Sequence, residues 1–164
     1  MAAESSSEVL AKSKVVHITR FGQVCAWFGP LQSGSDSTIL LLNVVNLLKE
    51  KWFHGDLSQE ESEDRLNDQP KGTYLIRFSS SSPGCFTISH MSKTKLVCHQ
   101  RVTHTPGKGF FFREGQYDTL RDHIRDQRKK HYFITPCPGS VFQKLFPKKD
   151  KKGAPEPAGG AYLG

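Results

Sequence analysis

The sequence has 164 residues, 36% of them hydrophobic and 24% charged, which fits one ordinary domain with extensions and excludes a chain that is disordered throughout. Lysine and arginine outnumber aspartate and glutamate by 23 − 16 = 7, which indicates an anionic partner: nucleic acid, anionic lipid or a phosphorylated protein. The start of the chain lacks the apolar core of a signal peptide, and the apolar run at residues 39–48 is shorter than the about 20 residues that span a bilayer. We therefore expect no membrane insertion.

The cysteines bear on the compartment of the protein. None of the four forms a C-x-x-C pair, which argues against a zinc ribbon or a thioredoxin-like site. Spacing alone leaves disulfides open, but free cysteine is among the most buried residue types. We therefore expect reduced cysteines packed in a core and, without a signal peptide, a cytoplasmic location. The four are Cys25, Cys85, Cys98 and Cys137.

The N-terminal part is predicted to be a disordered start followed by a helical segment. Residues 1–13 are small and polar, which is typical of disorder. Residues 14–50 form a helical linker segment, in which Gly29-Pro30 ends a first helix and a loop at residues 33–36 precedes a second. The apolar positions of the first helix are Phe21, Val24, Cys25 and Phe28. Those on one face of the second are Leu40, Leu41, Val44, Val45 and Leu48.

The middle of the chain carries clear local signals for a helix and three strands. Ser58 followed by Glu61 is a capping box, S-x-x-E, which predicts a helix of about ten residues that ends before Gly72. The links SSSSPG and MSKTK between the strands suit antiparallel hairpins. The strands are predicted at residues 73–79, 84–90 and 95–103.

The C-terminal part is predicted to contribute a short strand, a second helix and an extended end. The apolar strand is at residues 110–112, and the helix runs from Tyr117 to about Lys130. YFITPCP is extended, and four apolar residues after it are expected to pack back on the domain: Val141, Phe142, Leu145 and Phe146. The lysine-rich end, residues 147–164, has linker composition and is expected to be a disordered basic tail.

This order of elements predicts an α+β domain at residues 51–146. We expect a central antiparallel β-sheet flanked by two α-helices and preceded by the helical N-terminal segment. Side chains alternate between the faces of a strand, so adjacent hairpins bring one polar set onto a single face. That set is Arg77, Ser79, Thr87, His99 and Arg101. The loop serines Ser80, Ser81 and Ser82 lie at its rim.

Two arginines, an imidazole and several hydroxyls on one face suit a phosphoryl group. A phosphate monoester carries about −1.5 to −2 charges at pH 7, and the planar fork of arginine grips two of its oxygens at once. An arginine deep on a rigid strand is reached by phosphotyrosine, whereas phosphoserine stops short. The alternative for Arg77 is a half-exposed arginine paired with a carboxylate, but the facing strands hold no acidic residue.

The motifs W-F-H-G-D-L-S-x-x-E-S-E-x-R-L, G-T-Y-L-I-R-F-S and C-H-Q-R follow one another in the chain. In this order and at this spacing, the sequence resembles the Src homology 2 domain, the phosphotyrosine-recognition module, over residues 52 to about 138. Phe78 after the arginine is similar to the STAT type. The WFHGDLS opening is similar to amoeboid kinases that carry this domain after a kinase domain.

The resemblance implies roles for the polar face. Arg77 matches the arginine that grips the phosphate, and Gln59 stands where many members have a second, helical arginine. Gln100, on the opposite face from His99, is expected to help read peptide residues after the phosphotyrosine. The implied phosphotyrosine-binding set is Arg77, Ser79, Ser80, Ser81, Ser82, Thr87, His99, Arg101 and Gln59.

The predicted function is a non-catalytic module that binds tyrosine-phosphorylated proteins or peptides in intracellular signalling. We expect it to act as a monomer, with no cofactor, metal, catalytic residue or nucleic-acid partner. The chain lacks a tyrosine-phosphatase signature and the kinase motifs H-R-D and D-F-G, but it could be a regulatory fragment of a longer kinase. An RNA-binding module is a further alternative, because residues 108–112 partly match the motif K-G-F-[G/A]-F.

Overall fold

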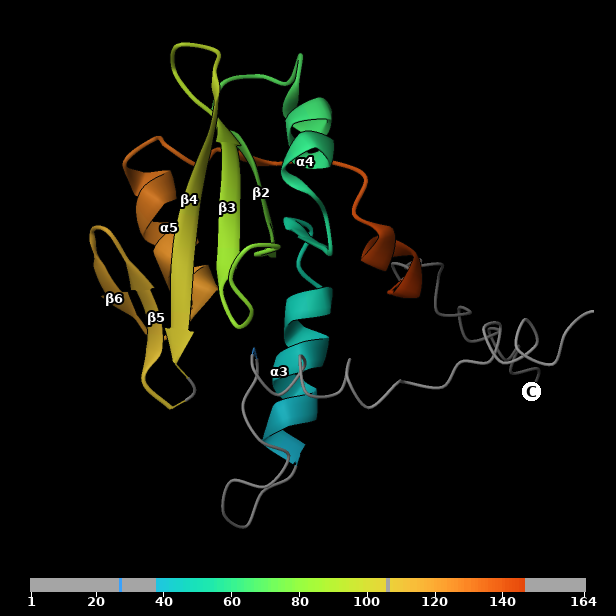
Figure 1. Cartoon of the computed structure of the whole chain (residues 1–164), viewed down its shortest axis with the longest axis vertical. Coiled ribbons are helices and arrows are strands. Elements are labelled where there is room, and N and C mark those ends of the chain that lie inside the picture. The colour runs from blue at the N-terminus through green and yellow to red at the C-terminus, as the bar shows by residue number, and fades with distance from the viewer. Residues whose placement is uncertain (1–26, 28–37, 106, 147–164) are drawn as a thin grey trace, which may run out of the picture.

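The computed structural model describes residues 27, 38–105 and 107–146 of the chain. Its helices are α3 (Thr38–Leu48), α4 (Gln59–Leu66), α5 (Leu120–Lys129) and a short 3-10 helix, η1 (Val141–Leu145). Its strands are β1 (Phe53–Gly55), β2 (Thr73–Phe78), β3 (Phe86–Met91), β4 (Val97–Thr105), β5 (Gly109–Phe112), β6 (Gly115–Tyr117) and β7 (Thr135–Pro136). Figure 1 shows α4 and α5 on opposite sides of the sheet, so the predicted α+β class is confirmed.

The strand that carries Arg77, β2, lies in the interior of the sheet. Its order is β1-β2-β3-β4-β5-β6, and β7 also pairs with β2. The β2–β3 and β3–β4 pairs are antiparallel, as the hairpin links predict. Both β1 and β7 pair with β2 in parallel, β1 along Ile76 and Arg77 and β7 along Thr73 and Tyr74. These two short strands share one edge of β2, so β2 is hydrogen-bonded on both edges.

Each face of the sheet has its own apolar core, because side chains alternate along a strand. Tyr74 and Ile76 belong to the larger core, which includes Leu120 of α5. Leu75 belongs to a smaller core with Leu66 of α4. Arg77 has the parity of Leu75 and therefore lies on the α4 side of the sheet.

Helix α4 begins at the predicted capping box. The Ser58 hydroxyl accepts a hydrogen bond from the Glu61 backbone N–H at 3.0 Å, and the Glu61 carboxylate accepts one from the Ser58 N–H at 2.7 Å. The helix has 8 residues and ends before the C-cap residue Asn67. Its buried positions, Ser62 and Leu66, hold it against the sheet.

The helix predicted to begin at Tyr117 begins three residues later, at Leu120. Tyr117 pairs with Phe110 in an antiparallel β5–β6 hairpin, and β6 was not predicted. Helix α5 begins after Thr119, whose hydroxyl accepts a hydrogen bond from the Asp122 backbone N–H at 3.1 Å. The prediction for Tyr117 was wrong because pairing with β5 and packing of its ring on Phe112, at 5.4 Å between centroids, hold it in an extended strand.

Two predictions of apolar packing were also wrong in part. The C-terminal end of helix α3 contacts the sheet at β1, so Leu47 is buried. Leu41, which was expected on the packed face of this helix, is 62% exposed. After β7, Phe142 stacks on Phe53 at 5.6 Å between ring centroids, but Val141 and Leu145 are exposed. The 3-10 turn lets one ring reach the core and leaves these two apolar side chains in solvent.

The cysteines and the chain ends are only partly covered by the structure. The described cysteines are free: Cys137 is buried, Cys85 is half-buried, and Cys98 is exposed, contrary to the expected packing. Cys25, the predicted first helix apart from Trp27, and the ends predicted to be disordered lie outside the described residues. Within the described ranges, no helix is long and apolar enough to cross a membrane.

Candidate functional site

Arg77 is a buried cation on the α4 side of the sheet. Its side chain lies on β2, and the residue is 4% exposed. One guanidinium nitrogen, Nη1, donates to the carbonyl oxygens of Leu57 and Phe78, both at 3.3 Å, while the buried Nε has no hydrogen-bond partner among the described residues. No ion pair in the described part of the chain involves Arg77. The guanidinium therefore keeps donor capacity that the protein leaves unused.

The buried position of Arg77 affects the pKa of its guanidinium group. Burial lowers the pKa of its guanidinium, and the negative charge of Glu63 partly offsets that shift. The alternative of a half-exposed arginine paired with a carboxylate does not match this geometry. An arginine that is buried without an ion pair attracts an anion from outside the protein.

A row of three residues crosses the sheet from Arg77. The strand register places Arg77 opposite Thr87 of β3, and Thr87 opposite Arg101 of β4. Thr87 is buried, whereas Arg101 is exposed and its Nη2 donates to the Ser81 hydroxyl at 3.0 Å. The predicted face thus has one arginine at its floor and a second at its rim.

The neighbouring row places His99 beside helix α4. His99 lies opposite Ser89, and its Nδ1 is 2.8 Å from the Ser89 hydroxyl. Its Nε2 is 3.0 Å from a carboxylate oxygen of Glu63, which also accepts a hydrogen bond from the Gln59 side chain at 2.8 Å. Both ring nitrogens of His99 are thus engaged, and neither contacts Arg77.

Glu63 is the acidic residue of the site that sequence reasoning missed. The hydrogen bonds from Gln59 and His99 lower the pKa of its carboxyl group, so it is ionised at neutral pH. Glu63 follows Gln59 by one helical turn, and this spacing is the signal that could have found it. Its carboxylate ties both side chains into one network next to Arg77.

The loop between β2 and β3 is closed at its base. The Ser79 backbone N–H donates to the carbonyl oxygen of Cys85 at 2.9 Å, and the Cys85 N–H donates to that of Ser82 at 3.1 Å. Ser79 is buried, Ser82 is half-buried, and the side chains of Ser80 and Ser81 are exposed. The side chains of Ser80 and Ser81 are therefore accessible to solvent, and the Ser81 hydroxyl already accepts from Arg101 of the polar face.

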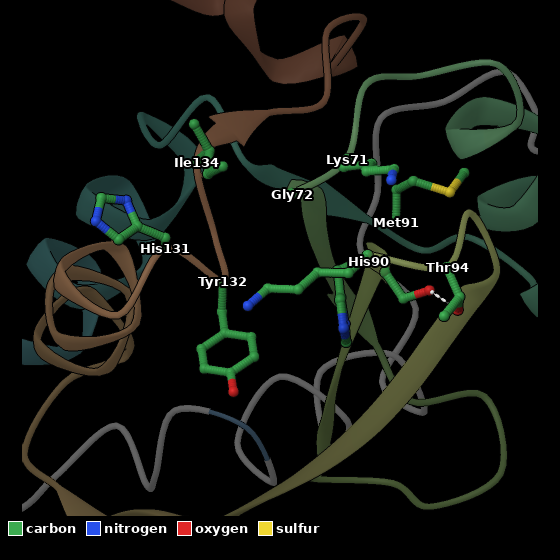
Figure 2. Close-up of a pocket in the computed structure, with 10 residues that line it drawn as sticks. Lys71, Gly72, His90, Met91, Thr94, His131, Tyr132 and Ile134 are labelled. Atoms are coloured by element: carbon green, nitrogen blue, oxygen red, sulfur yellow. Dashed lines mark hydrogen bonds between the residues drawn. The ribbon is translucent and has the colours of Figure 1, made fainter.

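Gln100 and a cavity lie away from this cluster. Gln100 has the parity opposite to His99, and its side chain donates to Glu114 at 3.0 Å. A cavity of about 340 Å³ lies between the β3–β4 turn and the segment after α5. Figure 2 shows the side chains that line it. Its lining residues include Lys71, His90, Met91, Lys93, Tyr132 and Ile134. The Lys93 ammonium lies 5.0 Å from the Tyr132 ring centroid.

Two of the three aromatic rings in the segment that suggested RNA binding pack in or against the core, whereas Phe111 is exposed. Phe112 is buried against His123, with the ring centroids 3.6 Å apart, and Phe110 stacks on His104 at 4.3 Å. Both belong to or pack against the larger core. A ring packed in this way is not free to stack on a base, which counts against an RNA-stacking role for Phe110 and Phe112.

The comparisons with known proteins agree on one family. The family model of the SH2 domain matches residues 52–135. A solved structure, the solution NMR structure of the Monosiga brevicollis CRK/CRKL homolog SH2 domain, aligns with a TM-score of 0.51 and 29% sequence identity. That alignment covers 55% of this chain and 88% of the other.

The sequence relatives include kinases of Dictyostelium discoideum. Dual specificity protein kinase shkA is 39% identical over 142 residues, which cover 87% of this chain and 26% of the kinase. Dual specificity protein kinase shkC is 39% identical over 120 residues, which cover 73% and 24%. The chain thus spans about a quarter of the length of these relatives. The predicted likeness to amoeboid kinases is confirmed.

Proposed function

This chain belongs to the SH2 domain family, whose members are phosphotyrosine-binding modules, and we propose on that premise that it binds tyrosine-phosphorylated proteins or peptides in signalling. The observation that carries the proposal is the burial of Arg77 without an ion pair among the described residues. Burying a charge is costly unless a partner compensates it. The phosphate of the ligand is that partner.

The cross-strand row of Arg77, Thr87 and Arg101 supports a phosphate site over this face of the sheet. Arg77 makes the bidentate contact at the floor, and Arg101 adds charge at the rim, where it already contacts Ser81. Ser79, Ser80, Ser82 and Thr87 supply hydroxyl and backbone N–H donors around the phosphate. The depth of Arg77 favours phosphotyrosine, because the aromatic ring spans the distance from the rim to the floor.

Two residues of the predicted set act through the Glu63 network. His99 and Gln59 both donate to the carboxylate of Glu63. His99 lines the pocket beside the phosphotyrosine ring while Glu63 and Ser89 hold its orientation. Gln59 adds a neutral donor at the start of α4, so the charge that grips the phosphate comes from the two arginines.

The peptide residues after the phosphotyrosine cross the outer edge of β4. Residues 97–102 of β4 pair with β3, whereas the described contacts of β5 are with residues 103–105. Gln100 lies on this part of β4 and contacts the peptide residues that follow the phosphotyrosine. Beyond it, the cavity takes one peptide side chain, and an apolar or acidic one fits because the ten lining residues include no aspartate or glutamate.

The kinase relatives suggest how such a module is used. Their names describe dual specificity kinases, and about a quarter of their length matches this chain. The chain itself lacks the kinase motifs H-R-D and D-F-G. Residues 51–146 would therefore supply recognition without catalysis, and in a longer kinase they would select phosphorylated partners.

The experiment that tests the proposal is fluorescence polarisation with a degenerate phosphotyrosine peptide pool. Wild type should bind with micromolar affinity, and Arg77→Ala should cost about 2–5 kcal/mol of binding, the range for truncating one partner of a buried charge pair. Arg125→Ala is a matched control, because it removes the same charge from an exposed residue of α5 that pairs with Asp122. It should bind like wild type.

The outcomes separate three explanations. Equal losses in the two variants would assign binding to the net charge of the chain and contradict a specific pocket. Binding of the unphosphorylated pool would contradict phosphate recognition. If wild type binds only the phosphorylated pool, sorting that pool identifies the preferred residues after the phosphotyrosine.

A further inference from the structure

Trp27, far from the site in sequence, contacts the base of the serine loop. Its indole ring stacks on Phe78 with 4.2 Å between the ring centroids. Its indole Nε1–H donates to the carbonyl oxygen of Cys85 at 2.9 Å, across 58 positions of sequence. Phe78 is the last residue of β2 and Cys85 immediately precedes β3, so Trp27 holds the residues on both sides of the loop.

The Cys85 carbonyl joins Trp27 to the phosphate-binding side of the sheet. The same oxygen accepts the Ser79 backbone N–H at 2.9 Å, the hydrogen bond that closes the loop. Ser79 lies on the Arg77 face by parity, whereas Phe78 and Trp27 pack with the larger core on the opposite face. Trp27 therefore contacts the base of the loop from the face of the sheet opposite to Arg77, so it would not touch a phosphate bound beside Arg77.

Trp27 also has a contact with His104 of β4. A hydrogen bond that His104 donates to the Trp27 backbone raises the pKa of His104, although burial lowers that pKa by more. His104 lies on β4 and stacks on Phe110 of β5. Trp27 is thus tied to β2, to β4 and to the start of β3, the three strands that carry the cross-strand row.

We propose that Trp27 is a positioning residue for the phosphate-binding loop, so that docking of the Trp27 side chain and binding of phosphotyrosine strengthen each other. This inference rests on the proposed function. A loop that is held in place by its ends loses less conformational freedom when a ligand binds. Because coupling between two binding events is reciprocal, phosphate bound on the loop must also stabilise the docked Trp27.

The binding arm of the test compares two variants that each remove an aromatic contact from the larger core. Trp27→Phe keeps a ring against Phe78 but loses the indole N–H, and it should weaken phosphotyrosine peptide binding about threefold to tenfold. Phe142→Leu is the matched control, because Phe142 is also half-buried but stacks on Phe53, which in turn packs on Phe78 at the border of the loop. It should lower the melting temperature and leave the peptide affinity at the wild-type value.

The second arm reads the indole directly, which separates positioning from a general loss of stability. The sequence has two tryptophans, so a ¹H–¹⁵N spectrum shows two indole signals, and Trp27→Phe identifies the one from Trp27. Titration with phenyl phosphate should shift that signal and slow its hydrogen exchange. Arg77→Ala should abolish both changes.

The outcomes distinguish this inference from the function on which it rests. If wild type ignores the phosphotyrosine peptides, the proposed function fails and the role of Trp27 fails with it. If wild type binds them, and Trp27→Phe binds equally well while the indole signal stays unchanged under phenyl phosphate, Trp27 is a core residue only. A loss of affinity in Trp27→Phe but not in Phe142→Leu, together with the indole shift, supports the positioning role.

Discussion

Arg77 shows at the scale of one residue why an arginine can occupy a buried strand position. Its hydrogen bonds to the carbonyls of Leu57 and Phe78 are long, 3.3 Å each, and its Nε has no partner among the described residues. Such a guanidinium is poorly compensated in the free protein. A dianionic ligand that accepts from the remaining N–H groups would supply the missing compensation, which is why this residue carries the functional proposal.

Glu63 leads to the first prediction at this scale. Its carboxylate lies next to a pocket proposed to receive a dianion, so it opposes binding. Glu63→Gln keeps an oxygen that accepts from His99 and Gln59 but removes the charge. We expect the affinity for phosphotyrosine peptides to rise about twofold to fivefold, within the range for a partly exposed charge. Fluorescence polarisation at low and high salt measures it, and salt should shrink the gain.

A matched control separates the local charge of Glu63 from the charge of the whole helix. Glu60→Gln changes the same charge on an exposed residue of α4. It should leave the affinity at the wild-type value. Weaker binding by Glu63→Gln would contradict the prediction and show instead that the ionised carboxylate is needed to hold His99 in place.

Helix α4 matters at the scale of elements because its first turns face the site. Its start depends on the reciprocal hydrogen bonds between Ser58 and Glu61. Ser58→Ala removes the side-chain acceptor and should lower the free energy of unfolding by about 1 kcal/mol, as is usual for loss of an N-cap. Urea denaturation monitored by circular dichroism measures this change.

The control for the helix cap is Ser58→Asp, which keeps an oxygen acceptor at the N-cap. It should unfold at nearly the wild-type urea concentration. If Ser58→Ala were as stable as wild type, packing of Leu66 in the smaller core would be sufficient to hold α4 without its cap.

At the scale of the whole molecule, buried histidines determine the response to acid. Burial lowers the pKa of four histidines, His54, His90, His104 and His123. The effect is largest for His123, which has no exposed surface and no hydrogen-bond partner for either ring nitrogen among the described residues. Its pKa falls from 6.5 to about 4.

The sign of the pH dependence follows from which state binds more protons. Between pH 6.5 and about 4, the unfolded chain protonates His123 and the folded protein does not, so stability falls as the pH decreases. From pH 7 to pH 5, we expect a loss of about 2 kcal/mol in the free energy of unfolding from His123 alone. Denaturant unfolding at the two pH values measures it.

The matched variant for acid sensitivity is His123→Phe. It keeps a ring that can stack on Phe112 but removes the titrating group. Its stability should fall less than that of wild type between the same pH values, with the remaining loss due to the other three histidines. An unchanged pH dependence would show that His123 is protonated in the folded protein.

Much of the site follows from short-range rules. The alternation of side chains and two short hairpin links were sufficient to place Arg77, Thr87 and Arg101 on one face, and the strand register has them in one row. The capping box located the start of α4 in the same way. These features depend on residues close in sequence, or on strands joined by tight turns.

The class of the fold and the polar face around Arg77 could be predicted from the amino-acid sequence, because both follow from local periodicity. The contact of Glu63 of α4 with His99, 36 positions away, and that of Trp27 with the loop carbonyl of Cys85, 58 positions away, became visible in the folded chain alone. The same holds for β1 and β7, which share one edge of β2, and for β6, which extends the sheet where a helix was expected at Tyr117. These contacts join segments whose meeting depends on how helices and sheet edges pack, and no local pattern in the sequence records that packing.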